Sequence, residues 1–102
     1  MLRVVSSQRF LDGEIIEEKV EDLKDNDFII IPIIDAEMQD LDGNDLYILS
    51  DGHHRKAAAE LLGIEVRYEE VKNEHNLTGE ALLDECYNDS DWYYVDTEIT
   101  VW

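Results

Sequence analysis

The residues best able to do chemistry lie together in segment 51–56, Asp-Gly-His-His-Arg-Lys. Gly52 follows an expected strand, Leu46 to Leu49, and opens an expected helix. The first backbone N–H groups of a helix have no partner within it. These groups and the positive end of the helix dipole attract anions such as phosphate. Glycine has no Cβ to block a ligand, so the segment predicts an anion-binding turn.

The side chains of this segment strengthen that prediction. Arg55 and Lys56 place two cations in the first helical turn, where acidic residues are usually preferred. The chain has only 8 Lys and Arg against 26 Asp and Glu. Two of these few cations at the positive end of a helix dipole are electrostatically unfavourable unless a bound anion offsets their charge. His53 and His54 add hydrogen-bond donors that can be charged near neutral pH. We therefore expect Gly52, His53, His54, Arg55 and Lys56 to contact phosphate.

Asp51 has three possible roles that the sequence leaves open. It could orient His54, hold Mg²⁺ beside a phosphate, or cap the helix that follows. Together with His53, His54 and His75 it could also suggest a transition-metal cluster. Adjacent histidines on a helix point in different directions, which disfavours that cluster.

Periodicity predicts the elements that must position this turn. Apolar residues at spacings of three and four indicate helices, and β-branched runs or strict alternation indicate strands. Pro32 implies an irregularity or an edge in its strand. We expect a small mixed sheet with packed helices, of the α/β (α+β) class, in one domain over residues 1–102. Helices are predicted at 14–24, 53–62 and about 77–86, and strands at 2–10, 28–34, 46–49, 64–69 and 92–102.

Two finer expectations concern the second helix. Ala58, Leu61 and Leu62 should form its buried stripe. The order strand, helix, strand from Leu46 to Tyr68 is typical of a right-handed crossover unit, in which the two strands run parallel.

The stretch from about residue 28 to 71 resembles the N-terminal domain of ParB-like proteins, within the ParB/sulfiredoxin superfamily. In that family a Pro-containing hydrophobic strand, a hairpin and a second strand lead into a Gly-x-x-Arg box, which opens a helix ending in Leu-Gly. The matching parts here are Pro32, the Asp42-Gly43 turn, the strand 46–49, the box Gly52-His53-His54-Arg55 and the helix end Leu62-Gly63.

The resemblance implies that the box binds nucleotide phosphates. The partition proteins bind CTP and the sulfiredoxins bind ATP. The sequence Asp-Gly-His-His-Arg also resembles the box of the ADP-dependent serine kinases. The resemblance then implies ATP, ADP or CTP with Mg²⁺ as the cofactor and NTP hydrolysis or phosphotransfer as the reaction. Asp51 and His54 are the catalytic candidates. His53 stands where sulfiredoxins carry a cysteine, so we do not expect sulfinic acid repair. We also expect no DNA-reading helical domain in this chain.

Charge and composition narrow the alternatives. The net charge of −18 disfavours direct binding of nucleic acids and of anionic membrane surfaces. No apolar run approaches the roughly 20 residues that span a bilayer. The single cysteine, Cys86, fits a reducing compartment, and we expect a cytoplasmic protein.

A second function stays open beside nucleotide binding. A small acidic protein of a phage or plasmid type could keep a non-catalytic ParB-like scaffold and use its negative surface to bind a basic or DNA-binding protein, in imitation of DNA. Nuclease activity, a third possibility, fits the charge less well.

Overall fold

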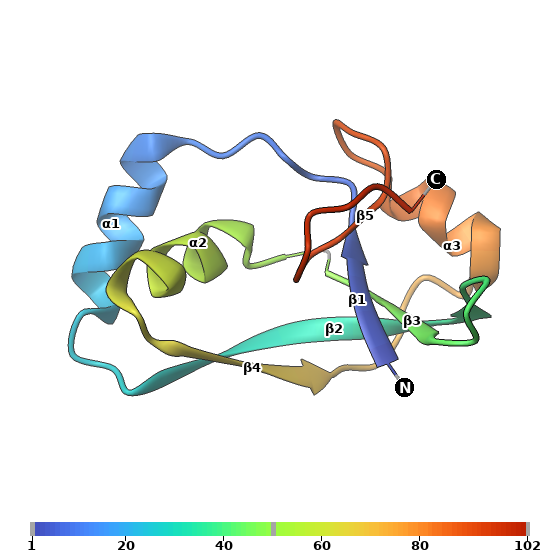
Figure 1. Ribbon diagram of the computed structural model, residues 1–102, viewed down its shortest axis with the longest axis horizontal. Helices are drawn as coiled ribbons and strands as arrows, with labels where there is room; N and C mark the ends of the chain where they lie inside the picture. The colour runs from blue at the N-terminus through green and yellow to red at the C-terminus, as the bar shows by residue number, and fades with distance from the viewer. Residues whose placement is uncertain (1, 50, 102) are drawn as a thin grey trace.

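The computed structural model describes residues 2–49 and 51–101, in which a five-stranded mixed sheet is combined with three helices (Figure 1). This confirms the expected α/β (α+β) class. In chain order the elements are β1 (Leu2–Ser6), α1 (Gly13–Leu23), β2 (Phe28–Gln39), β3 (Asp45–Ile48), α2 (His53–Leu62), β4 (Glu65–Glu70), α3 (Gly79–Cys86) and β5 (Tyr93–Tyr94).

The strand order is β4-β2-β3-β1-β5, with parallel pairs β1–β3 and β2–β4 and antiparallel pairs β2–β3 and β1–β5. Because β2 is parallel to β4 and antiparallel to β3, the strands β3 and β4 run in opposite directions. The expectation of a parallel crossover unit from Leu46 to Tyr68 is therefore wrong. β2 lies between those two strands. It has twelve residues and extends to Gln39, beyond the predicted end at residue 34.

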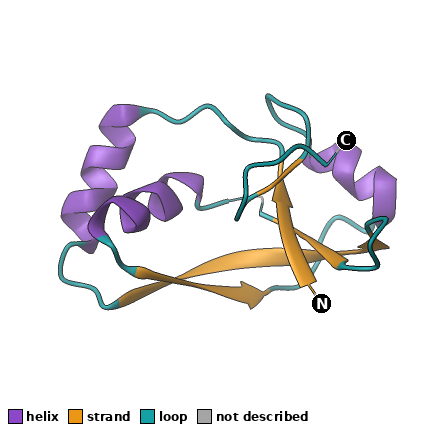
Figure 2. Cartoon of the chain, in the orientation of Figure 1, coloured by secondary structure: helices purple, strands orange, loops and turns teal. Residues whose placement is uncertain are grey.

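The sheet separates two hydrophobic cores. On one face, Ile29, Ile31 and Ile33 of β2 pack with Ala58 and Ala59 of α2, and α1 lies against α2. On the opposite face, α3 packs over the far half of β2 and over β3. Figure 2 shows α1 and α2 at one end of the sheet and α3 at the other. Each buried isoleucine contributes about 1.5–3 kcal/mol of transfer free energy.

The buried face of α2 differs from the expected one. Ala58 and Ala59 are fully buried and Leu62 is half-buried, whereas Leu61 is 73% exposed. A helix turns about 100° per residue, so residues 58, 59 and 62 share one face and residue 61 falls outside it. The alanines let α2 approach β2 closely, and the expectation for Leu61 is corrected.

The two ends of the chain contain less strand than expected. β1 ends at Ser6, and residues 7–12 cross over the sheet as an extended connection. Among the described residues 92–101, only Tyr93–Tyr94 pairs as a strand, with one further bridge between Tyr93 and Thr100. Within the described ranges, no helix is both long and apolar enough to cross a bilayer.

Candidate functional site

Gly52 forms the turn that starts α2. Its φ of 89° lies in the left-handed region, and a Cβ built on it would lie 3.1 Å from Cδ1 of Ile31. Both facts favour glycine, because other residues seldom adopt this backbone and their Cβ would press against the Ile31 side chain. Across residues 2–49 and 51–101, no acceptor is in hydrogen-bonding geometry with the N–H groups of His53 and Arg55. Among the described residues, these two amides therefore have no acceptor and could donate to an anion.

His53 is buried beneath the turn. Its Nε2 lies 2.6 Å from Oγ of Ser6 at the end of β1, and that oxygen also accepts the N–H of Gln8 at 3.0 Å. Burial lowers the pKa of His53, and the neighbouring His54 lowers it further. The ring is therefore neutral at neutral pH and serves as a dipolar partner for its neighbours.

His54 and Arg55 point to other neighbours. Nε2 of His54 accepts the backbone N–H of Asp12 at 3.0 Å, where α1 begins. The guanidinium of Arg55 donates to the carbonyl oxygen of Ile30 at 3.2 Å. These two side chains and His53 thus tie the start of α2 to α1, β2 and β1 respectively.

Asp51 is exposed, and its Oδ1 accepts the N–H of Gly52 at 2.8 Å. This contact satisfies one amide of the turn. In the part of the chain that the structure covers, no group of three or more His, Cys, Asp or Glu could hold a metal ion. Asp51 also does not line the pocket beside the first turns of α2. It therefore does not fit a metal site that serves this pocket.

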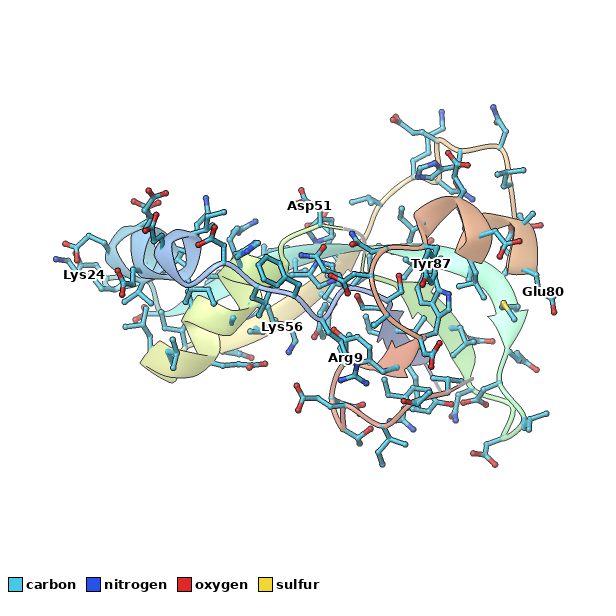
Figure 3. All side chains as sticks on the ribbon, turned by 90° about the horizontal axis from the view of Figure 1, so that it is seen from above. Arg9, Lys24, Asp51, Lys56, Glu80 and Tyr87 are labelled. Atoms are coloured by element: carbon cyan, nitrogen blue, oxygen red, sulfur yellow. The ribbon has the colours of Figure 1, made fainter. Side chains whose placement is uncertain are left out.

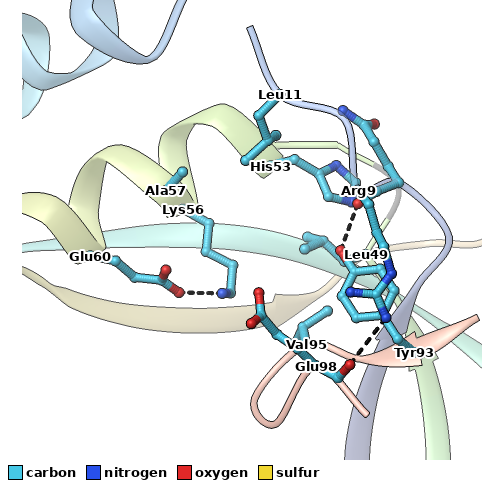
Figure 4. A pocket seen from close by; sticks show the side chains of 11 residues that line it. Arg9, Leu11, Leu49, His53, Lys56, Ala57, Glu60, Tyr93, Val95 and Glu98 are labelled. Carbon is cyan, nitrogen blue, oxygen red and sulfur yellow. Dashed lines mark hydrogen bonds and ion pairs between the residues drawn. The ribbon is translucent and has the colours of Figure 1, made fainter. Parts of the chain in front are cut away.

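A pocket of about 130 Å³ lies beside the first turns of α2, against the segment after β1 and the C-terminal segment. Figure 4 shows its lining. We call it the Arg9–Lys56 pocket, because these two cations face it together. Its other polar and aromatic lining includes His53, Glu60, Tyr93 and Glu98.

Arg9 is held in place from both sides. Its backbone N–H donates to the Asp89 carboxylate at 2.8 Å, while its guanidinium lies 4.0 Å from the centre of the Tyr93 ring and donates to the carbonyl oxygen of Glu98 at 3.0 Å. A guanidinium has five N–H donors, so one such bond leaves others for a ligand. The position of Arg9 depends on three contacts with residues 80 or more places further along the chain.

Lys56 reaches the same pocket from α2 and forms an ion pair with Glu60 one turn later. The Lys56 side chain is 17% exposed and that of Glu60 is 60% exposed, so the ion pair is partly buried. An anion in the pocket competes with Glu60 for this cation. Figure 3 shows Arg9 and Lys56 close together and Asp51 apart from them.

The structure divides the predicted site. His53 and Lys56 line the pocket, whereas Gly52 shapes the turn and Asp51, His54 and Arg55 contact other elements. Sequence reasoning missed Arg9, which belongs to no motif. The scarcity of basic residues was the only signal that could have drawn attention to it.

The other predicted groups lie outside this pocket. His75 is exposed, and Cys86 is a half-buried free thiol whose pKa is raised by burial. At the β2–β3 turn, a groove of about 500 Å³ is lined by Asp40 and Tyr94 among others. The Tyr94 hydroxyl donates to Asp40 at 2.6 Å, which raises the pKa of Tyr94 to about 12. This bond ties the turn to the C-terminal segment.

Models of protein families, curated proteins and solved structures give no match to this chain. The resemblance to ParB-like domains consequently stays a prediction from the residues.

Proposed function

We propose that the Arg9–Lys56 pocket binds the phosphate end of a nucleotide. The observation that carries this proposal is that two cations from segments 47 residues apart, Arg9 and Lys56, line one pocket at the first turns of α2. Glu60 and Glu98 line the same pocket, so its formal charge is balanced, whereas the chain as a whole has a net charge of −18. The pocket therefore repels an anion less than a surface with the average charge of this chain does.

The size of the pocket decides which part of the ligand enters it. Pockets that enclose a whole drug-sized ligand have volumes of about 300–1,000 Å³, and this one measures about 130 Å³. A phosphate group fits this space, whereas a base and ribose do not fit with it. The nucleoside part therefore lies outside, and the pocket selects for phosphate more strongly than for the base.

The resemblance to ParB-like domains supports a nucleotide in particular. Two of its box-region residues, His53 and Lys56, line the pocket. ATP, ADP and CTP are the ligands to test. The proposed function is binding of phosphate; Asp51, the residue expected to hold Mg²⁺, does not line the pocket.

A thermal-shift titration tests this proposal. Phosphate, ADP, ATP and CTP, each with and without Mg²⁺, should raise the melting temperature of the wild type. A ligand at ten times its Kd stabilises by about 1.4 kcal/mol, which corresponds to a shift of several degrees in a domain of this size. Arg9→Gln and Lys56→Met should each remove most of the shift, because each deletes one cation.

Lys24→Met is the matched control. Lys24 also pairs with a glutamate one turn away, Glu21, but on α1 and away from the pocket. This variant should keep the full ligand-induced shift. Equal shifts in all three variants, or no shift with any compound at millimolar concentration, would contradict the proposal.

A further inference from the structure

One half of the sheet face opposite α1 and α2 is uncovered. Because side chains alternate along a strand, Ile29, Ile31 and Ile33 face α2, and Phe28, Ile30 and Pro32 face the other way. Phe28, the first residue of β2, is 38% exposed and Ile30 is 43% exposed, whereas Ile29, Ile31 and Ile33 between and after them are buried. Figure 1 shows no described helix below β2 and β4 at this end. We call Phe28, Ile30 and Pro32 the open stripe.

Further along β2, the same face is covered. Ile34 and Ala36 point to the same face of the sheet as the open stripe, because they follow it at every second position of β2. They are buried with Leu82 and Leu83 of α3. The open stripe is therefore the uncovered continuation of an existing core. α3, with eight residues, is too short to extend over it.

The open face of this part of the sheet carries apolar side chains on β2. Residues 28–33 of β2 pair with β4 in parallel, and sheets made wholly of parallel strands are covered by helices on both faces, whereas this mixed sheet has described helices on one face at this end. Antiparallel strands, by contrast, often keep one wet face with polar side chains. The open stripe carries phenylalanine, isoleucine and proline, which is typical of a surface that another helix covers.

The charges around the open stripe indicate what that helix carries. Across the ladder, Glu65 and Glu69 of β4 lie opposite Phe28 and Pro32, and Asp27 precedes the stripe. Arg67, opposite Ile30 on β4, lies 3.8 Å from the centre of the Phe28 ring and pairs with Glu65 at 3.0 Å. These two charges offset each other, and the carboxylates of Glu69 and Asp27 give the surroundings of the stripe a negative charge. An apolar stripe between carboxylates complements an apolar helix face flanked by Lys or Arg.

A second copy of the chain is a poor occupant by the same reasoning. Two molecules with a net charge of −18 each repel one another. Pairing through this face would also bring the carboxylates of Glu65 and Glu69 close to those of the partner.

We propose that the open stripe is the docking surface for a basic amphipathic helix of another protein. The apolar face of that helix covers Phe28, Ile30 and Pro32, and its flanking Lys or Arg side chains approach Glu65 and Glu69. This docking surface is separate from the Arg9–Lys56 pocket. The pocket lies on the side of the sheet that α2 covers, whereas the open stripe lies on the opposite side, so the two proposals are independent.

The probe is a synthetic 18-residue amphipathic helix of leucine and lysine, with a leucine and glutamate peptide of the same pattern as its counterpart. Added to ¹⁵N-labelled protein, the basic peptide should shift the amide signals of residues 27–33 and 65–70, and the acidic peptide should shift none. Shifts scattered over the whole acidic surface would overturn the proposal, because they would show attraction by net charge alone.

Two matched pairs of variants separate the apolar and the charged contributions. Ile30→Ser should weaken binding about tenfold, since it removes the central apolar contact, whereas Leu61→Ser, at an exposed leucine on α2, should not change it. Glu65→Gln with Glu69→Gln should weaken binding about threefold to tenfold. Glu17→Gln with Glu18→Gln on α1 removes the same net charge and should have little effect. Equal losses within either pair would overturn the proposal.

Three further measurements guard this interpretation. The ¹⁵N spectrum of each variant reports whether it is folded, and Ile30→Thr, which keeps a β-branched side chain, replaces Ile30→Ser if that variant unfolds.

Sedimentation without peptide should show a monomer, and a dimer that Ile30→Thr dissociates would assign the open stripe to a second copy instead. Arg9→Gln should bind the peptide normally, so failure of the nucleotide experiment leaves this test intact.

Discussion

The hydroxyl of Ser6 lies 2.6 Å from Nε2 of His53, and both side chains are buried. This contact joins the end of β1 to the first residue of α2, which are 47 residues apart in the sequence. It also fixes the His53 ring at the wall of the Arg9–Lys56 pocket. The shape of the pocket therefore depends on a serine that belongs to no motif.

Ser6→Ala should destabilise the protein by about 1–3 kcal/mol, because it leaves the buried His53 ring and the Gln8 N–H without their partner. Urea unfolding followed by circular dichroism measures this loss. Thr97→Ala is the control, since the Thr97 hydroxyl accepts one exposed N–H at 3.3 Å, and its cost should stay within about 0.5 kcal/mol. A Ser6→Ala variant as stable as the wild type would show that the contact adds nothing to the fold.

His53 should make stability depend on pH. Burial lowers its pKa below the ordinary value of 6.5, so on acidification the unfolded chain takes up this proton before the folded one does. The contribution of His53 is thus complete above pH 6.5 and is lost as the pH falls through the lower, folded pKa.

The measurement compares the wild type with His53→Gln, so that the titration of the many carboxylates cancels. Between pH 8 and pH 5, the unfolding free energy of the wild type relative to the variant should fall, by at most about 1.4 kcal/mol per pH unit. A difference that stays constant over this range would contradict the assignment of a buried neutral ring.

Gly52→Ala should destabilise by about 1–2 kcal/mol from its positive φ alone, with an additional cost from the contact with Ile31. Gly43→Ala separates the two causes, because Gly43 has a φ of 83° but no neighbour within 4 Å. Thermal unfolding of both variants provides the comparison. If Gly52→Ala costs no more than Gly43→Ala, the close approach of Ile31 does not constrain the turn.

Local patterns in the sequence were sufficient for the class of fold and for most elements. The helical spacing of Ile16, Val20 and Leu23 predicted α1, and the β-branched run from Phe28 predicted the start of β2, since these signals depend only on near neighbours in the chain. Gly52 and Gly63 marked the two ends of α2, where both adopt a positive φ. The candidate turn was likewise visible as six consecutive residues, 51–56, and anion binding there stays a prediction.

Only the tertiary structure decided which residues meet. Arg9 joins Lys56 because Asp89, Tyr93 and Glu98 hold it there, and no local pattern encodes contacts over such separations. The direction of β4 and the exposure of Leu61 were misjudged for a related reason: strand order and the buried side of a helix depend on which neighbour is present. The sequence by itself determined the elements and the chemical character of the turn, while long-range packing determined which of its side chains face the pocket.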